Sequence, residues 1–246
     1  MPIPSVDDSF ATKLLPFVLS VIAGCADIIA FLGLDGLFTA HITGNLVILA
    51  ARFLAGGPAP VAQLISVPVF IVALVLTRLL AGGLEHLRIA SLRPLLLLQF
   101  LLLAAFLAIG AAAGPRVDPN ALTMICAGMM GVSAMAVQNA LVRISLAGAP
   151  STAVMTTNIT AFTMDVGEML LARDPIGIAK ARSRAKHTWP AIAGFLFGCA
   201  LGGLGEAVIG LRSLVLPAGL ALFALALGMA ANPDPAKRSS SIHTEK

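Results

Sequence analysis

Long apolar runs dominate this chain and restrict it to one class of fold. Hydrophobic stretches of about twenty residues recur along its 246 residues, of which 58% are hydrophobic and only 11% charged. Soluble domains carry about 25% charged residues, whereas about 20 consecutive apolar residues are what a helix needs to cross a bilayer. The strands of an outer-membrane barrel would instead alternate apolar and polar residues. The sequence therefore predicts an all-α, polytopic membrane helical bundle.

Glycine, proline and charged residues divide the apolar sequence into eight predicted helical segments. These segments are residues 14–34, 38–55, 61–83, 94–113, 121–141, 152–172, 189–210 and 214–231. The polar and serine-rich residues 232–246 are expected to form a disordered cytoplasmic tail.

A near-repeat relates the two halves of the chain. The sequence TAHITGNL at residues 39–46 is matched by TAVMTTNI at residues 152–159. Further matches follow in the same order, namely Gly-Gly-Leu at 82–84 and 202–204, and Leu-Arg at 92–93 and 211–212. Shared landmarks in a shared order indicate a duplicated unit. The sequence therefore predicts two internal membrane repeats, residues 1–114 and 115–231.

The repeated motif places polar residues inside the second segment of each half. Irregular backbone exposed to lipid is untenable within a bilayer, so residues 38–55 and 152–172 are predicted to be broken or re-entrant helices packed against protein. The chain would then have six crossings, with its halves inverted relative to each other. The alternative is eight full crossings with parallel halves. Both arrangements put most Lys and Arg residues on the cytoplasmic side together with both termini, so charge leaves the choice open, and we favour six.

Two motifs resemble the signature of a known family. The sequence GCAD at 24–27 followed by FTAHITGN at 38–45, and QNALVR at 138–143 followed by residues 152–158, are similar to motifs of the YoaK family. This resemblance spans nearly the whole chain and implies a multi-pass protein of the bacterial inner membrane, usually drawn with six transmembrane helices. It implies no substrate, because that family is defined by an uncharacterised domain.

Polar side chains within the apolar segments are the candidate binding residues. Asp27 lies mid-helix, where an ionised carboxylate costs roughly 2.5–3.5 kcal/mol, so it should be paired, protonated or facing water. It could bind a proton or cation, or it could be only an internal hydrogen-bond partner. His41 could titrate near neutral pH or bind a substrate. The predicted substrate-binding set is Asp27, His41, Thr43, Gly44, Asn45, Gln138, Asn139, Thr156 and Asn158.

The repeated Asn and Thr residues also suit helix N-termini. Asn45 and Asn158, with Thr43 and Thr156, are residue types that cap such termini. We expect the two termini to converge near the bilayer midplane, where their N–H groups and partial positive charge could hold an anionic or polar ligand. Pure capping is the alternative.

Two further patterns predict structural roles. Asp165 and Glu168 lie one turn apart and are expected to pair with Arg143 or Arg173 at the inner interface. Small residues recur every four positions and predict close packing against another helix, inside the monomer or between subunits: Gly194, Gly198 and Gly202.

No motif points to catalysis, a metal or a cofactor. The sequence lacks a nucleophile elbow, an HExxH helix, a P-loop and a Rossmann fingerprint, and its three cysteines and four histidines form no ligand pattern. Its basic residues lie at segment ends and loops, which argues against nucleic-acid binding. We therefore expect a non-enzyme without cofactors, whose partners are membrane lipids and an unknown small-molecule or ion substrate, with homo-oligomerisation left open.

Taken together, these features predict a small secondary transporter or permease with a central polar site at the two interrupted helices. Secondary transport is favoured because no nucleotide site is present. The alternative is a non-transporting scaffold, lipid-interacting or sensor protein in which the motifs only cap and pack helices. An intramembrane enzyme would require Asp27 and His41 to reach a common substrate.

Overall fold

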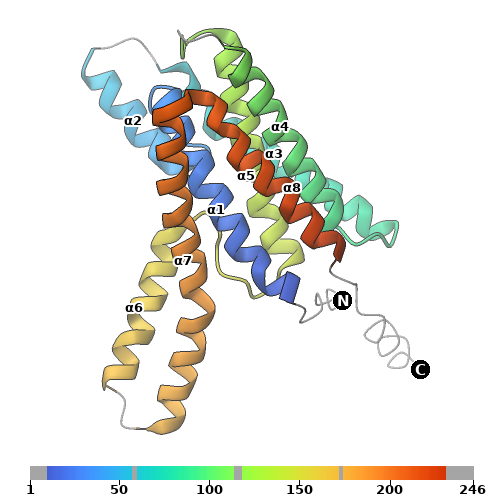
Figure 1. Ribbon diagram of the computed structural model, residues 1–246, viewed down its shortest axis with the longest axis vertical. Helices are drawn as coiled ribbons and strands as arrows, with labels where there is room; N and C mark the ends of the chain where they lie inside the picture. Colours follow the sequence, from blue (N-terminus) through green and yellow to red (C-terminus); the bar gives the residue numbers. More distant parts are fainter. Residues whose placement is uncertain (1–9, 57–59, 114–117, 172–173, 231–246) are drawn as a thin grey trace.

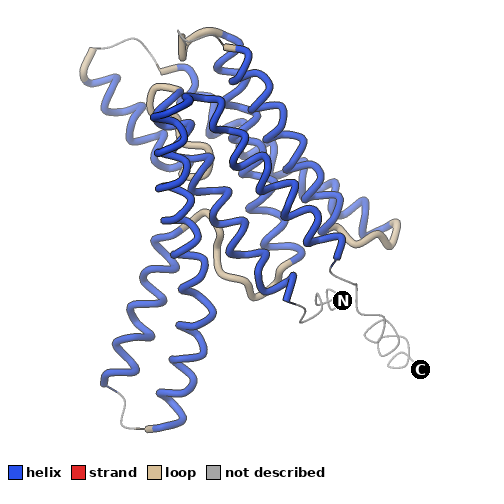
Figure 2. Tube along the Cα trace, in the orientation of Figure 1, coloured by secondary structure: helices blue, strands red, loops and turns tan. Residues whose placement is uncertain are grey.

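The computed structural model describes residues 10–56, 60–113, 118–171 and 174–230, and within them the regular structure is entirely helical (Figures 1 and 2). The predicted tail at 232–246 and the predicted boundary between the halves at 114–115 lie outside the described residues. The elements in chain order are α1 (Phe10–Gly33), α2 (Ile42–Leu54), α3 (Val61–His86), α4 (Leu92–Ala112), α5 (Leu122–Ser145), α6 (Met155–Leu171), α7 (Pro175–Ile209), the short 3-10 helix η1 (Gly210–Leu214) and α8 (Val215–Ala230).

Five stretches of the described chain are long and apolar enough to cross a membrane. They are Leu14–Gly33, Val61–His86, Leu92–Ala112, Leu122–Ser145 and Pro175–Ala230, the last of which contains α7, η1 and α8. Helices of this length and hydropathy mark a multi-pass membrane protein, as the composition predicts. The helix α2 is apolar but too short to span.

The helices α1 and α5 are the most deeply buried spans, and α3 is the most exposed. Helix α1 packs mainly against α7 and α8, and α5 packs mainly against α3 and α4. Helix α2 packs on α3, and α6 packs on α7. The core of the bundle therefore lies around α1 and α5, with α2 and α6 each attached to one neighbouring helix.

Glycines bring the backbones of α1 and α7 into contact. A Cβ atom on Gly24 would lie 2.3 Å from the carbonyl oxygen of Phe195, and one on Gly198 would lie 2.3 Å from that of Val21. Neither distance leaves room for a side chain. The predicted small-residue stripe thus packs inside the monomer. Helices α1 and α7 run in the same direction, because Gly194 lies beside Phe17 and Gly202 lies beside Cys25.

Contacts between helix ends define the two ends of the bundle. At the end drawn at the top of Figure 1, here the upper end, Leu211 of η1 lies beside Gly33 of α1 and Gly110 of α4. At the opposite, lower end, the Arg93 side chain donates hydrogen bonds to the carbonyls of Gly228 and Met229, both at 3.1 Å. The start of α1 and the end of α8 also lie at the lower end (Figure 1).

Helix α7 differs most from its predicted segment, because it begins at Pro175 rather than at residue 189. Asp174 caps it by accepting hydrogen bonds from the N–H groups of Ile176 and Gly177, and proline suits the first helical position. The sequence predicts no helix between residues 172 and 189, because the residues there are mostly polar and charged. A helix outside the bilayer carries such charges freely, and here α6 and the first part of α7 project from the bundle as a hairpin (Figure 1).

Candidate functional site

A short segment between α1 and α2 turns back into the bundle at the Asp27 carboxylate. This segment, residues 34–41, is called the first strap. Asp27 is only 4% exposed, and its Oδ1 accepts hydrogen bonds from the N–H groups of Thr39 (2.7 Å) and Ala40 (2.6 Å) and from the Thr39 hydroxyl (3.2 Å). The N–H group of His41 lies 3.4 Å away. Asp27 lies about 9 Å below the end of α1 by helical rise, so the strap reaches well below the upper end.

The first strap is anchored at the upper end by a second set of contacts. Arg52, at the end of α2, donates to the Asp35 carboxylate and to the Asp35 carbonyl, each at 2.7 Å. Gln63, at the start of α3, also donates to that carbonyl at 2.9 Å. The Arg52 guanidinium holds the pKa of the Asp35 carboxyl below its ordinary value. The ends of α1 and α2 and the start of α3 therefore meet at the upper end. The chain enters the bundle there as the first strap and returns to the same end as α2.

Asn45 joins the strap to α2 and α3. Its buried amide accepts from the N–H of Phe38 and donates to the carbonyl of Phe38, both at 2.8 Å, and it donates to the Ser66 hydroxyl at 2.9 Å. The N-cap of α2 is His41, without a side-chain hydrogen bond to the helix. The expected capping of α2 by Asn45 and Thr43 is therefore wrong, because the amide pairs with strap backbone instead.

The side chains of His41 and Thr43 are exposed and point away from the buried cluster. The His41 ring centroid lies 5.6 Å from that of Phe38, and only the backbone N–H of His41 faces Asp27. A Cβ atom on Gly44 would lie 2.8 Å from the Phe38 ring. Gly44 is thus needed for packing of Phe38.

The second half repeats the arrangement with a different polar group. Residues 146–154, the second strap, lead into α6. Gln138, which is fully buried on α5, donates to the Thr152 hydroxyl and to the Leu19 carbonyl, both at 2.9 Å. Thr152 occupies the same motif position as Thr39. A buried polar side chain of the preceding helix thus holds the motif threonine in both halves, as a carboxylate in the first and an amide in the second.

The motif asparagines also act alike. The Asn158 amide donates to the carbonyl of Ser151 at 2.6 Å, and Ser151 occupies the motif position of Phe38, the residue that Asn45 binds. Thr156 is exposed, and Asn139 donates to the Met135 carbonyl of its own helix at 2.8 Å. The repeated TAxxTxN pattern therefore closes each strap onto the first turn of the helix that follows.

Gln99 on α4 is a buried member of the second cluster that sequence reasoning missed. Its amide nitrogen donates to the Gln138 Oε1 at 2.7 Å, and its own Oε1 has no hydrogen-bond partner in the described structure. Its orientation is determined, because the Leu19 carbonyl requires the Gln138 nitrogen and so leaves the Gln138 oxygen for Gln99. The available signal was a lone glutamine within the leucine run of the segment 94–113.

The nine predicted binding residues do not form one central site. Asp27 and the Leu19 carbonyl mark the first and second clusters on α1, about 12 Å apart along the helix. Helices α2 and α6 pack on different partners, α3 and α7. The expected convergence of the two helix N-termini is therefore not observed.

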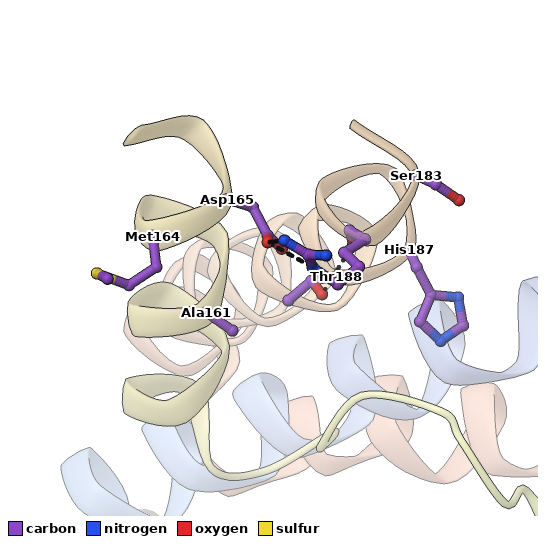
Figure 3. A pocket seen from close by; sticks show the side chains of 7 residues that line it. Ala161, Met164, Asp165, Ser183, His187 and Thr188 are labelled. Carbon is purple, nitrogen blue, oxygen red and sulfur yellow. Dashed lines mark hydrogen bonds and ion pairs between the residues drawn. The ribbon is translucent and has the colours of Figure 1, made fainter. Parts of the chain in front are cut away.

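A groove of about 560 Å³ lies between α6 and α7 in the projecting hairpin (Figure 3). The Asp165 side chain is directed toward α7, where the Arg184 guanidinium binds both Asp165, at 2.7 Å, and Glu168. The expected partner, Arg143 or Arg173, is thus replaced by Arg184, while Arg173 lies outside the described residues. His187 also lines the groove and contacts the Gly148 carbonyl at 2.9 Å, which ties the hairpin to the second strap.

A family model described as "Protein of unknown function (DUF1275)" matches residues 15–227, which include both straps, both buried clusters and the hairpin. The chain belongs to this family. It shows no significant similarity to a curated protein or to a solved structure. Across the described part of this DUF1275 chain, no three His, Cys, Asp or Glu side chains lie close enough to hold a metal ion. The chemistry that the two straps offer is therefore that of the buried Asp27 carboxylate, two amide networks and exposed hydroxyls.

Proposed function

We propose that this protein is a small secondary transporter or permease of the bacterial inner membrane, in which Asp27 binds the translocated or coupling cation, a proton in the simplest case. The observation that carries the proposal is the state of this carboxylate. Within the described chain, the hydrogen bonds that Asp27 accepts all go to its Oδ1 atom, which leaves Oδ2 available to a proton or cation. Acidic side chains at membrane depth commonly mark ion pathways and proton relays.

The path of the chain supports six crossings with inverted halves. Because the first strap and α2 enter and leave at the upper end, α1, α3 and α4 make three crossings. Helices α5, α7 and α8 make three more, in the opposite sense. Inverted halves that carry discontinuous helices are a recurring plan of secondary transporters.

The helix packing supports an axis that exchanges α1–α4 with α5–α8. Under that exchange the α1–α7 contact becomes α5–α3, α1–α8 becomes α5–α4, and α2–α3 becomes α6–α7, all of which are present. The excess of Lys and Arg at the lower end favours cytoplasmic termini. Membership of the DUF1275 family is compatible with the resemblance to the YoaK family.

The straps suggest how ion binding is coupled to movement. When ionised, Asp27 accepts two short hydrogen bonds from the N–H groups of Thr39 and Ala40 in the first strap. Protonation or cation binding withdraws charge from that acceptor and loosens the strap. The second strap is held by the neutral Gln138, which does not titrate. The first half therefore responds to the bound ion while the second half stays fixed.

Proteoliposomes on a solid-supported membrane test the proposal. A jump in pH, Na⁺ or K⁺ concentration should give a transient current with the wild type that is lost in Asp27→Asn, because the amide keeps an acceptor for the strap but does not titrate. Glu85→Gln, which removes a half-exposed carboxylate at the end of α3, should leave the current unchanged. Wild-type currents no larger than those of empty liposomes under all three jumps would refute ion-coupled transport and favour the scaffold alternative.

Single cysteines test the topology. In a background of Cys25→Ser, Cys126→Ala and Cys199→Ala, the exposed positions Ala55 and Ala90 follow α2 and α3. With six crossings, Ala55→Cys reacts with a membrane-impermeant maleimide from the periplasm, and Ala90→Cys reacts only from the cytoplasm. The reverse pattern would mean eight crossings and parallel halves.

A further inference from the structure

Contacts between α4 and α8 show which residues of these two helices occupy equivalent places in the two halves. A Cβ atom on Gly110 of α4 would lie 3.1 Å from the Leu214 side chain, and one on Gly228 of α8 would lie 2.5 Å from the Leu96 side chain. A single offset of 118 residues converts the first contact into the second, since it relates the two glycines and also the two leucines. It also places every buried position between residues 95 and 110 on a buried position of η1 or α8. The offset is one residue smaller than that of the Leu-Arg pairs of the sequence, because the 3-10 helix η1 rises more per residue than an α-helix.

The offset relates Gln99 of the second cluster to Pro217 in the first turn of α8. Both residues are buried. Asp27 and Gln138 are equivalent as well, because each holds the motif threonine of its strap. The exchange of halves turns the α5–α4 contact into the α1–α8 contact, so Pro217 stands to Asp27 as Gln99 stands to Gln138.

The register between α1 and α8 agrees with this equivalence. Leu211 lies beside Gly33 at the upper end, where α1 ends and from which α8 descends (Figure 1). Asp27 precedes Gly33 by six residues, and Pro217 follows Leu211 by six residues. The two residues therefore lie at about the same height on helices that run in opposite directions.

The two equivalent places differ in whether a hydrogen-bond donor is present. The Gln99 amide nitrogen donates to the Gln138 Oε1 at 2.7 Å. Pro217 has no such donor, and no other residue of α8 has a side chain that donates a hydrogen bond. Asp27 Oδ2 is the counterpart of the Gln138 Oε1, because Oδ1 takes the place of the nitrogen that binds the motif threonine. Oδ2 therefore receives no donor from the helix that would supply it.

Asp27 Oδ2 is also accessible. It has no hydrogen-bond partner among the described residues, yet the fully buried side-chain atoms without a partner in the same part of the chain comprise only the Gln99 Oε1. Oδ2 is not one of these atoms, so it retains accessible surface.

The surroundings of Oδ2 favour a proton over an alkali cation. An alkali cation needs several protein oxygens in place of its hydration shell, whereas a proton needs one lone pair. Helix α8 carries no side-chain oxygen. The other titratable groups on the elements around Asp27 are the Cys199 thiol on α7, beside Gly24, and the exposed His41 ring of the first strap.

We propose that Asp27 Oδ2 is a proton-binding atom and that Pro217 determines this specificity by withholding the donor that Gln99 gives to Gln138. Proton binding forms an O–H bond at Oδ2 with a proton delivered by hydronium, and it neutralises the carboxylate. This inference rests on the proposed ion site at Asp27 and names the ion.

Infrared difference spectroscopy of the protein in liposomes, titrated with pH, tests the role of Pro217. Protonated Asp27 gives a carboxylic C=O band that is absent in Asp27→Asn. In Pro217→Gln the new amide donates to Oδ2 and stabilises the ionised form, so the midpoint of this band should fall by about one to two pH units. Pro217→Asn carries the same amide on a shorter side chain and should give a smaller fall. Neither replacement removes a backbone hydrogen bond, because proline has no N–H group.

The matched control is Gly219→Gln, which adds an amide to the same helix at an exposed position. Its Cβ atom would meet no described atom within 4 Å, and the midpoint should stay that of the wild type. An unchanged midpoint in both Pro217 variants would overturn the inference, and so would a wild-type spectrum without the band.

Currents on the solid-supported membrane separate this inference from the proposed transport. In the wild type a pH jump should give a current and Na⁺ or K⁺ jumps should give none, while the pH dependence of the current should shift in Pro217→Gln as the band does. A wild-type current driven by Na⁺ or K⁺ would overturn the proton specificity and leave ion-coupled transport standing. A wild type without any current, but with a band that Pro217→Gln shifts, would refute transport and support the proton site.

Discussion

The contact between α1 and α7 gives the prediction with the best-defined magnitude, the substitution Gly198→Ala. The added methyl group would lie 2.3 Å from the Val21 carbonyl oxygen and 3.0 Å from two further backbone atoms of Val21. A carbon and a carbonyl oxygen in contact lie about 3.3 Å apart. Because the obstacle is backbone, no side-chain rotation relieves the clash, and the two helices must separate locally by about 1 Å.

Three terms set the size of the effect. A gap of about 0.5–1 Å removes roughly a quarter to a half of the dispersion energy of each contact, and overpacking of this kind costs about 1–3 kcal/mol. The separation also weakens the hydrogen bond from the Cys25 thiol to the Gly198 carbonyl, which is 3.1 Å long. Alanine offsets part of this loss by about 0.5–1 kcal/mol through its higher helix propensity. The free energy of unfolding should therefore fall by about 2 kcal/mol.

The control is Gly203→Ala on the same helix, where the new methyl group would lie an ordinary 3.5 Å from Ile28. Unfolding in mixed micelles of dodecyl maltoside and SDS, followed by circular dichroism, gives the free energy for both variants. Gly24→Ala disturbs the same helix contact from the α1 side. The losses in unfolding free energy of Gly24→Ala and Gly198→Ala should therefore be less than additive in the double variant. Equal stability of Gly198→Ala and Gly203→Ala would refute the argument from close helix approach.

Three further predictions concern the straps and use the same unfolding measurement. Asn45→Ala should lower stability more than Asn158→Ala, because Asn45 makes three hydrogen bonds to groups of the strap and α3. Each buried partner left unpaired should cost about 1–3 kcal/mol. Equal losses in the two variants would contradict the assigned roles. The pKa of Asp35 is lowered by Arg52, so Arg52→Gln should be less stable than the wild type at neutral pH. This difference in the free energy of unfolding should vanish as pH falls through the folded-state pKa of Asp35, below about 3.9. That difference should be under about 1 kcal/mol, since both side chains are partly exposed. Gln138→Leu should cost several kcal/mol, because it leaves three buried partners without their hydrogen bonds.

Much of the fold follows from the sequence because the bilayer leaves few alternatives. Apolar length alone locates α1, α3, α4, α5 and α8 to within a few residues of their predicted segments. The two polar interruptions identify the straps, since such residues need partners inside the protein. Helix α7 was misjudged because hydropathy detects only the part of a helix that lies in lipid.

The candidate site was less predictable, because residue type does not determine which partner a polar group chooses. Asn45 is a good capping residue in isolation, yet its amide meets the backbone of Phe38 through the fold of the strap. The pairing of Asp165 with Arg184 depends on the register between α6 and α7, which the sequence does not encode locally. Gln99 acquires significance only through Gln138, on another helix.

The differences between the halves are more informative about function than the repeated motif. The motif asparagines and threonines have the same structural role in both halves, which is to join each strap to its neighbouring helix. A scaffold requires no more than that role. At the place where the motif threonine is held, one half has the titratable Asp27 and the other the neutral Gln138. The second half also carries α7 (Pro175–Ile209), which is longer than its counterpart α3 (Val61–His86). A scaffold with two equivalent halves would repeat such features, and the buried Asp27 carboxylate, which occurs in one half only, is the difference on which the proposed ion site rests.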